Sequence, residues 1–300
     1  MSTPASTESL SVSPSASSSS RPNSLWRALR SNRIAWIGAA MLLAIAVIAA
    51  FAPWLAPHDP IQQNIAYRLD PPSADYLLGT DSYGRDVLSR LIYGAQISLL
   101  VGFAAVMIAM IIGSLLGILA GYLGGWFDQV VMGMVDVMLS FPTLLLGLMV
   151  AAMLGASLKN LILAIAITEI APFVRISRAP TISLKRRDFV DAGRALGFSP
   201  IRIMYVHILP NLASDIVVLA SLWMASAIRT EASLSFIGLG VKPPTATWGG
   251  MIRDGFENIL DSWWLIVFPC IAILFTVMTL NLLGDALRDS LDPKLRGEQK

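Results

Sequence analysis

The sequence predicts an all-α integral membrane protein with six transmembrane helices, and three observations lead to this fold class. Hydrophobic residues make up 55% of the 300 residues and charged residues only 14%, whereas an ordinary soluble domain carries about 25% charged residues. The mean hydropathy of the chain is +0.65. Several apolar runs also have about the 20 residues that a helix needs to cross the hydrocarbon core of a bilayer.

The apolar runs place the predicted spans at roughly 34–54, 97–121, 130–153, 159–177, 209–230 and 263–285. The fourth and fifth runs are the least regular. The fourth contains Glu169 and Pro172, and the fifth begins near Pro210 and includes Asp215. Because the number of spans is even, both termini are expected on the same side of the membrane.

The predicted spans divide the chain into four regions. They are a disordered, Ser-rich cytoplasmic tail (1–24), the first transmembrane helix with a long outer loop (25–96), the transmembrane core (97–287) and a cytoplasmic C-terminal tail (288–300). The N-terminal tail is low in complexity and cannot bury a core. A signal peptide is the alternative for the first apolar run, because Ala50-Phe51-Ala52 resembles a cleavage site. The long tail before that run favours an uncleaved anchor.

The distribution of lysine and arginine predicts the orientation. With the N-terminus inside, 15 of the 22 basic residues lie on the inner side and seven on the outer side. Such an excess marks the cytoplasmic side of a membrane protein. The loop between the fourth and fifth spans is therefore expected in the cytoplasm.

Composition and motifs exclude several functions. The net charge of +2, with no basic run interleaved with aromatics, argues against nucleic-acid binding. One cysteine, Cys270, cannot form an internal disulfide, and with two histidines the chain cannot supply a zinc site. The sequence has no G-x-x-x-x-G-K-[ST], H-E-x-x-H or G-x-S-x-G motif. We expect no catalytic residue, no metal and no cofactor bound by this chain.

The predicted cytoplasmic loop contains a short helix at residues 186–198, with Phe189, Ala192 and Leu196 along one face. Gly193 and Gly197 lie on an adjacent strip, where another backbone could approach closely. A short helix with an exposed apolar face can dock in the groove of a partner. The alternative is a helix that lies flat on the lipid surface.

The loop and four other stretches resemble one family. The spacing of Asp191-Ala192-Gly193, then Gly197, then Ile208-Leu209-Pro210 resembles the "EAA…G…I-LP" loop of ABC import permeases, with Asp in place of the usual Glu. The stretches "LLGTDSYGRDVLSRLIYGAQISLLVG", "AGYLGGWFDQVVMGMVDVMLSFP", "EASLSFIGLGVKPPTATWGGMI" and "LNLLGDALRDSLDPKLR" are similar to the C-type subunit of dipeptide and oligopeptide permeases. The resemblance covers about residues 25 to 296 and leaves out the Ser-rich tail.

This resemblance implies a type I ABC importer permease fold in the bacterial cytoplasmic membrane. It also implies partners: a sister permease subunit, two ATPase subunits that use ATP and Mg, and an extracytoplasmic substrate-binding protein. The loop near 185–209 would be the coupling loop that contacts the ATPase, through Asp191, Ala192, Gly193, Leu196, Gly197, Ile208, Leu209 and Pro210. The expected cargo is di- or oligopeptides, with glutathione or a nickel complex as alternatives.

Acidic residues within the spans are further candidates, because a charge in the bilayer is unfavourable and is usually functional or paired. Asp136, Glu169 and Glu231 are candidates for the translocation path or for contacts between helices. On the outer side, pairs of i and i+4 spacing among Asp81, Arg85, Asp86 and Arg90 are expected to brace the start of a helix.

Two alternatives belong to other functional classes. A self-sufficient secondary transporter should have inverted repeats or a charged relay across several spans, and the sequence shows neither. A membrane scaffold subunit without a transport path is the other alternative.

Overall fold

The structure is a computed structural model that describes residues 33–291. The regular secondary structure of the described residues is helical, with no strand and one isolated bridge between Thr80 and Asp86. The predicted tail 1–24 lies outside these residues, and so does the end of the C-terminal tail.

Four helical segments are long and apolar enough to cross a membrane. They are α4 (Val87–Leu123), α7 (Leu158–Leu184), the segment Pro200–Ile237 that ends with α10 (Leu209–Ile237), and α12 (Trp264–Leu291) up to Asp289. If the bent pair α5 (Gly125–Ser140) and α6 (Thr143–Leu154) counts as one span, the described residues contain five spans. The first predicted span (34–54) corresponds to the shorter apolar helix α2 (Arg33–Ala50). The all-helical membrane fold is therefore confirmed.

The third predicted span differs from a straight helix. Residues 130–153 fall on α5 and α6, whose axes differ by 99°. Pro142 lies at this break, directly before α6, and the preceding Phe141 is extended with ψ of 140°. Proline disfavours helical geometry at the residue before it and donates no N–H, which explains why the helix turns here.

Several helices are longer than the predicted spans. α4 begins at Val87 because Asp86 caps it, its carboxylate accepting a hydrogen bond from the Ser89 N–H at 2.9 Å. The predicted boundary at residue 97 thus falls inside α4. α10 extends past residue 230 to Ile237, where Gly238 ends it in the left-handed region with φ of 97°.

α4 and α7 form the most extensive helix pair. Gly113, Gly117 and Gly121 recur every four residues on α4, and each faces the backbone of α7. A Cβ on Gly113 would lie 2.7 Å from the Ile170 carbonyl oxygen, and one on Gly121 would lie 2.8 Å from that of Arg178. Small residues at this spacing let two membrane helices approach closely. This repeat was not among the sequence predictions.

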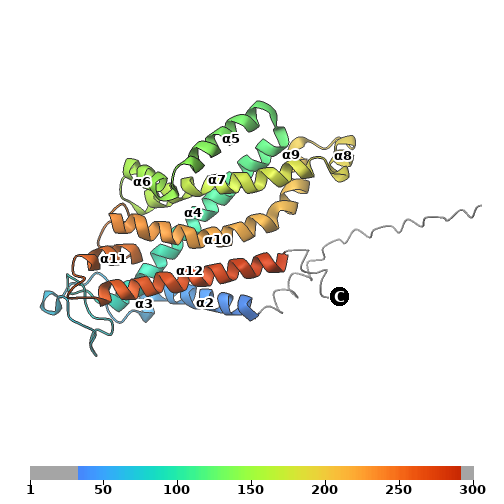
Figure 1. Ribbon diagram of the computed structural model, residues 1–300. Coiled ribbons are helices and arrows are strands. Elements are labelled where there is room, and N and C mark those ends of the chain that lie inside the picture. The colour runs from blue at the N-terminus through green and yellow to red at the C-terminus, as the bar shows by residue number, and fades with distance from the viewer. Residues whose placement is uncertain (1–32, 292–300) are drawn as a thin grey trace, which may run out of the picture.

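The bundle has two different ends (Figure 1). At one end lie α11 (Trp248–Phe256), α3 (Ala52–Leu55), the short η1 (Ile65–Tyr67) and the loop before α4; we call this the α11 end. At the opposite end lie α8 (Asp188–Ala195) and α9 (Pro200–Arg202); we call this the α8 end. α4, α7 and α10 run between the two ends.

Candidate functional site

The loop between α7 and α10 forms a compact helical hairpin at the α8 end. α8 covers Asp188–Ala195, slightly less than the predicted 186–198. Asp188 and Asp191 lie in its first turn and Arg194 in its last turn. This distribution of charge is favourable for a helix dipole.

Gly197 ends α8 with a specific backbone motif. Its φ is +79°, and its N–H donates to the Arg194 carbonyl at 2.9 Å. The N–H of Phe198 donates to the Gly193 carbonyl at 3.0 Å. These two bonds define a Schellman motif, which favours glycine at the left-handed position. Gly197 therefore sets the shape of the hairpin, and the space where its Cβ would lie is open.

Gly193 faces the interior of the hairpin. A Cβ at this position would lie 3.2 Å from the Phe198 ring. That ring stacks on His207, with centroids 5.8 Å apart, and the Arg202 guanidinium lies 4.1 Å from its centre. The close approach that the sequence suggested at Gly193 thus takes place within this chain. Whether a partner also approaches the hairpin stays a prediction.

The outward face of the hairpin is apolar. Leu196 is 74% exposed, Ile201 75% and Phe189 41%. Ala192 is exposed on the same face, whereas Val190 is buried on the opposite one. Asp191 is also exposed and pairs with Arg194 at 3.0 Å. The structure therefore places an unpartnered apolar surface where the sequence predicted a docking helix.

The hairpin continues without interruption into a membrane span. Ser199 caps the next segment, its hydroxyl accepting from the Arg202 N–H at 3.3 Å, and Pro200 occupies the first turn. A π-helical stretch, Ile203–Ile208, leads into α10. Pro210 in the first turn of α10 lacks the N–H of a regular helix, and the Leu209 N–H reaches back to the Met204 carbonyl. Pro200–Ile237 counts as one span, so a displacement of the hairpin can pass to α10.

A cavity of about 420 Å³ lies beside the hairpin. Its lining residues include Gly121 of α4, Gly124 between α4 and α5, Lys185 and Arg186 after α7, and Arg194 of α8. Three basic residues and two aspartates line this cavity, so its lining has a small excess of positive charge.

Asp136 and Glu231 each connect two helices, one of the two roles that the sequence suggested for them. Asp136 of α5 accepts a hydrogen bond from Arg175 of α7 at 2.9 Å. Glu231 of α10 is fully buried and accepts hydrogen bonds from Ser98 of α4 at 3.1 Å and from Ser235 at 2.7 Å. Both are interhelix contacts in this structure.

Glu169 differs from these two acids. Its side chain is 0% exposed, and neither carboxyl oxygen accepts a hydrogen bond from the described residues at normal geometry. The polar groups of α10 that interact with it are Ser226 and Arg229. Asp215, in contrast, is exposed near the α8 end of α10.

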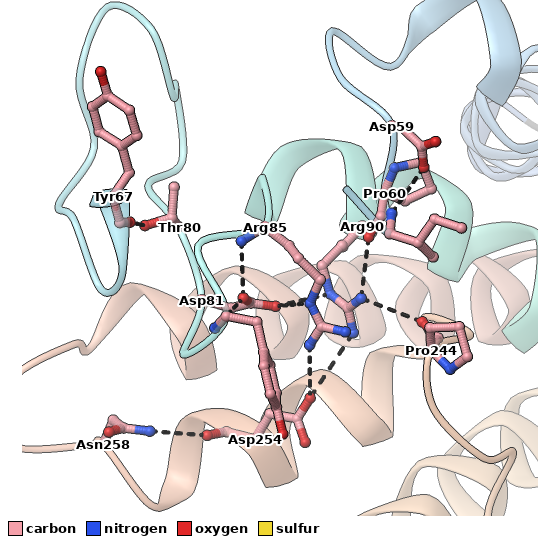
Figure 2. A network of polar contacts seen from close by, with 12 residues as sticks. Asp59, Pro60, Tyr67, Thr80, Asp81, Arg85, Arg90, Pro244, Asp254 and Asn258 are labelled. Atoms are coloured by element: carbon pink, nitrogen blue, oxygen red, sulfur yellow. Dashed lines mark hydrogen bonds and ion pairs between the residues drawn. The ribbon is translucent and has the colours of Figure 1, made fainter. Parts of the chain in front are cut away.

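A buried ionic network holds the α11 end together (Figure 2). Asp81 pairs with Arg85 at 2.7 Å and with Arg90 at 3.3 Å, and both arginines reach Asp254 of α11, at 3.6 and 3.9 Å. Arg90 also donates to the carbonyls of Pro60 and Pro244. The predicted Asp81–Arg85 pair is present, but Arg90 pairs with Asp81 and Asp254 because Asp86 is occupied in capping α4.

Comparisons with known proteins agree with this fold. Residues 113–297 match the family described as "binding-protein-dependent transport system inner membrane component", and residues 23–72 match the "N-terminal TM domain of oligopeptide transport permease C". One chain of the solved MetNI methionine ABC transporter has a TM-score of 0.54 and 17% identity, covering 68% of this chain and 97% of that one. This likeness shows the fold alone.

Three curated relatives cover nearly the whole chain. The chain is 43% identical to the di/tripeptide transport system permease protein DppC of Pseudomonas aeruginosa, over 90% of this chain and 91% of the relative. It is 44% identical to the dipeptide permease DppC of Escherichia coli K12 (90% and 92%). It is also 44% identical to the glutathione transport system permease protein GsiD of Salmonella typhimurium (91% and 90%).

The helical fold and these matches define a membrane-embedded permease subunit of an ABC importer, a class that works with a substrate-binding protein. The chain belongs to this family, in its dipeptide and oligopeptide permease C branch.

Two polar interactions were missed by the sequence reasoning. Arg178 of α7 pairs with Asp128 of α5, and the charge of Arg229 on α10 acts on the buried Glu169 of α7 without an ion pair between them. The signal was present in the sequence, because an arginine inside or beside a span needs a partner or water. The count of basic residues used these arginines only for orientation.

Proposed function

We propose that this chain forms part of the path for di- or oligopeptides across the cytoplasmic membrane, driven by ATP that separate subunits hydrolyse. Its relatives carry names for dipeptide, di/tripeptide and glutathione transport. These cargoes are all short peptides with a free carboxylate. The absence of a nucleotide-binding motif from the sequence supports a separate energy source.

The hairpin at the α8 end is the proposed contact for an ATPase subunit. The observation that carries this proposal is its exposed apolar face, formed by Phe189, Ala192, Leu196 and Ile201, on a segment continuous with a span. A short helix of this kind fits a groove in a partner. Asp191 and Arg194 lie beside this face and can add charged contacts.

The proposed assembly follows from this arrangement. The α8 end lies in the cytoplasm with both termini, and the α11 end faces the substrate-binding protein. Two permease subunits are needed because the helices of one chain enclose little space. The partner is a related but different permease, as the similarity to permease C subunits implies. ATP and Mg are bound by the two ATPase subunits, and this chain binds no cofactor or metal.

Reconstituted complexes can test the coupling role. Leu196→Asp places a charge on the exposed apolar face, where the side chain is 74% exposed and supports little of the fold. We expect substrate-stimulated ATP hydrolysis to fall at least about tenfold, since burying an unpaired charge in an interface is strongly unfavourable. Ala195→Asp is the matched control, because Ala195 is exposed on the side of α8 that carries Asp188. Stimulated hydrolysis at the wild-type rate in Leu196→Asp would contradict the proposal.

Uptake by vesicles that contain the complex identifies the cargo. Labelled dipeptide, glutathione and a nickel complex should be compared side by side, with the cognate binding protein present. We expect peptide uptake that depends on ATP. Uptake without ATPase subunits would instead support a secondary transporter, and no uptake of any cargo would support a scaffold.

A further inference from the structure

Arg229 is an exposed arginine within a membrane span. It lies on α10, about 12 Å along the axis from the end of the helix at Ile237, at 1.5 Å per residue. Within the part of the chain that the structure describes, no carboxylate forms an ion pair with its guanidinium. A charge at this depth is unfavourable against lipid, and such residues face a protein partner or water.

Arg229 belongs to a polar stripe on α10. Ser226, Arg229, Thr230 and Ser233 follow the spacing i, i+3, i+4 and i+7, which places them on one face of a helix. The Ser233 hydroxyl donates to the Arg229 carbonyl at 2.9 Å. The opposite side of α10 includes Ile228, which is fully buried. Arg229 is exposed and the other three residues are partly buried, so the stripe lies at the edge of the packed core, with Arg229 pointing away from it.

Glu169 lies on α7 and interacts with two residues of this stripe. It is fully buried on α7, has no hydrogen-bond donor at normal geometry among the described residues, and interacts with Ser226 and Arg229. A buried carboxyl beside a guanidinium attracts it and limits its orientations. Glu169 therefore attracts the Arg229 guanidinium toward α7 without forming an ion pair with it, and the guanidinium N–H groups stay free of any carboxylate of the described residues.

We propose that this stripe lines the translocation path and that Arg229 binds the free α-carboxylate of the transported peptide, with Glu169 as a positioning residue. The inference rests on the proposed function. A guanidinium offers parallel N–H donors that match a carboxylate in bidentate geometry. Every peptide with a free C-terminus carries this group, so the contact accepts many side chains.

The path-lining role predicts a charge preference that is measurable without transport. Ser233→Cys in a Cys270→Ala background, assembled with the sister permease and the ATPases, places a thiol one turn from Arg229. We expect a sulfonate-bearing methanethiosulfonate to react about tenfold faster than a trimethylammonium one, because a cation concentrates anions in a narrow path. Arg229→Gln should remove the preference and Arg229→Lys should keep it.

Arg175→Gln is the matched control, because Arg175 is an exposed arginine of α7 that already pairs with Asp136 in this chain. It should leave the charge preference unchanged. Absence of reaction with both reagents, or an unchanged preference in Arg229→Gln, would overturn the path-lining role. Loss of the sister permease from purified Arg229→Gln complexes would instead assign Arg229 to the subunit interface and overturn the proposal.

Protection by peptides tests the carboxylate contact. Ala-Ala should slow labelling of the introduced thiol, and Ala-Ala amide at the same concentration should not. Arg229→Gln should abolish this protection, and Glu169→Gln should raise the half-protecting concentration several-fold without lowering the amount of assembled complex. Equal protection by the amide would overturn carboxylate recognition. Charge preference without protection by any peptide would overturn the peptide as ligand and with it the proposed cargo. Absence of the charge preference when Arg229 is intact, in a Ser233→Cys complex that still imports peptides, would overturn only this inference.

Discussion

Asp81→Asn is the most informative perturbation of the α11 end. The Asp81 carboxylate forms ion pairs with Arg85 at 2.7 Å and with Arg90 at 3.3 Å, and the side chains of all three residues are less than 7% exposed. It also accepts hydrogen bonds from the N–H groups of Tyr83 and Arg85 through Oδ1. Asparagine keeps an oxygen for these backbone bonds and removes only the charge.

The size of the effect follows from the charges that remain. In Asp81→Asn, two buried guanidinium groups depend on Asp254, which lies 3.6 and 3.9 Å away and is 35% exposed. Leaving a buried ion without its close partner typically costs about 3–5 kcal/mol. The loop before α4 and the start of α4 should therefore come loose from α11.

Thermal denaturation of the detergent-solubilised complex measures this loss. We expect the midpoint to fall by about 5–10 °C and protease cleavage between residues 56 and 86 to become faster. Asp261→Asn is the matched control, because Asp261 is exposed. Adding Arg90→Gln to Asp81→Asn should recover part of the loss by removing one unpaired charge. Equal midpoints for Asp81→Asn and Asp261→Asn would refute the reasoning.

Three further predictions concern orientation, an interhelix acid and pH. In a Cys270→Ala background, a cysteine that replaces Ser199 should be shielded from an impermeant thiol reagent in intact cells, and a cysteine that replaces Thr245 should react. Both positions are exposed, so reversed labelling would contradict the orientation. Glu231→Leu should lower stability by about 1–3 kcal/mol because two buried serines lose their acceptor, while Glu231→Gln should be milder in thermal denaturation; equal effects would contradict this. Burial raises the pKa of Asp254 above its ordinary 3.8, against the opposing effect of Arg90 and Arg85. The contribution of Asp254 to stability is therefore complete below pH 3.8 and declines as pH rises through the raised pKa. Asp254→Asn should flatten this decline in denaturation midpoints measured from about pH 4 to about pH 6.

The sequence by itself determined the class of fold and the existence of its spans. Apolar runs of sufficient length dictate helices in a bilayer, because every backbone polar group must be satisfied within the segment. The same local logic placed the short helix near Asp188–Ala195, since its apolar residues recur at helical spacing. Such patterns involve neighbours along the chain and need no knowledge of packing.

Only the tertiary structure decided which side chains meet. The pairing of Arg90 with Asp254 joins residues far apart in the chain, and so does the contact of Gly117 with Val174. Gly193 illustrates the limit best, because its spacing suggested contact with a partner while the folded hairpin puts the Phe198 ring against it. Helical periodicity tells which residues share a face, but the object that covers that face is set by how the helices pack, and this depends on many distant contacts at once.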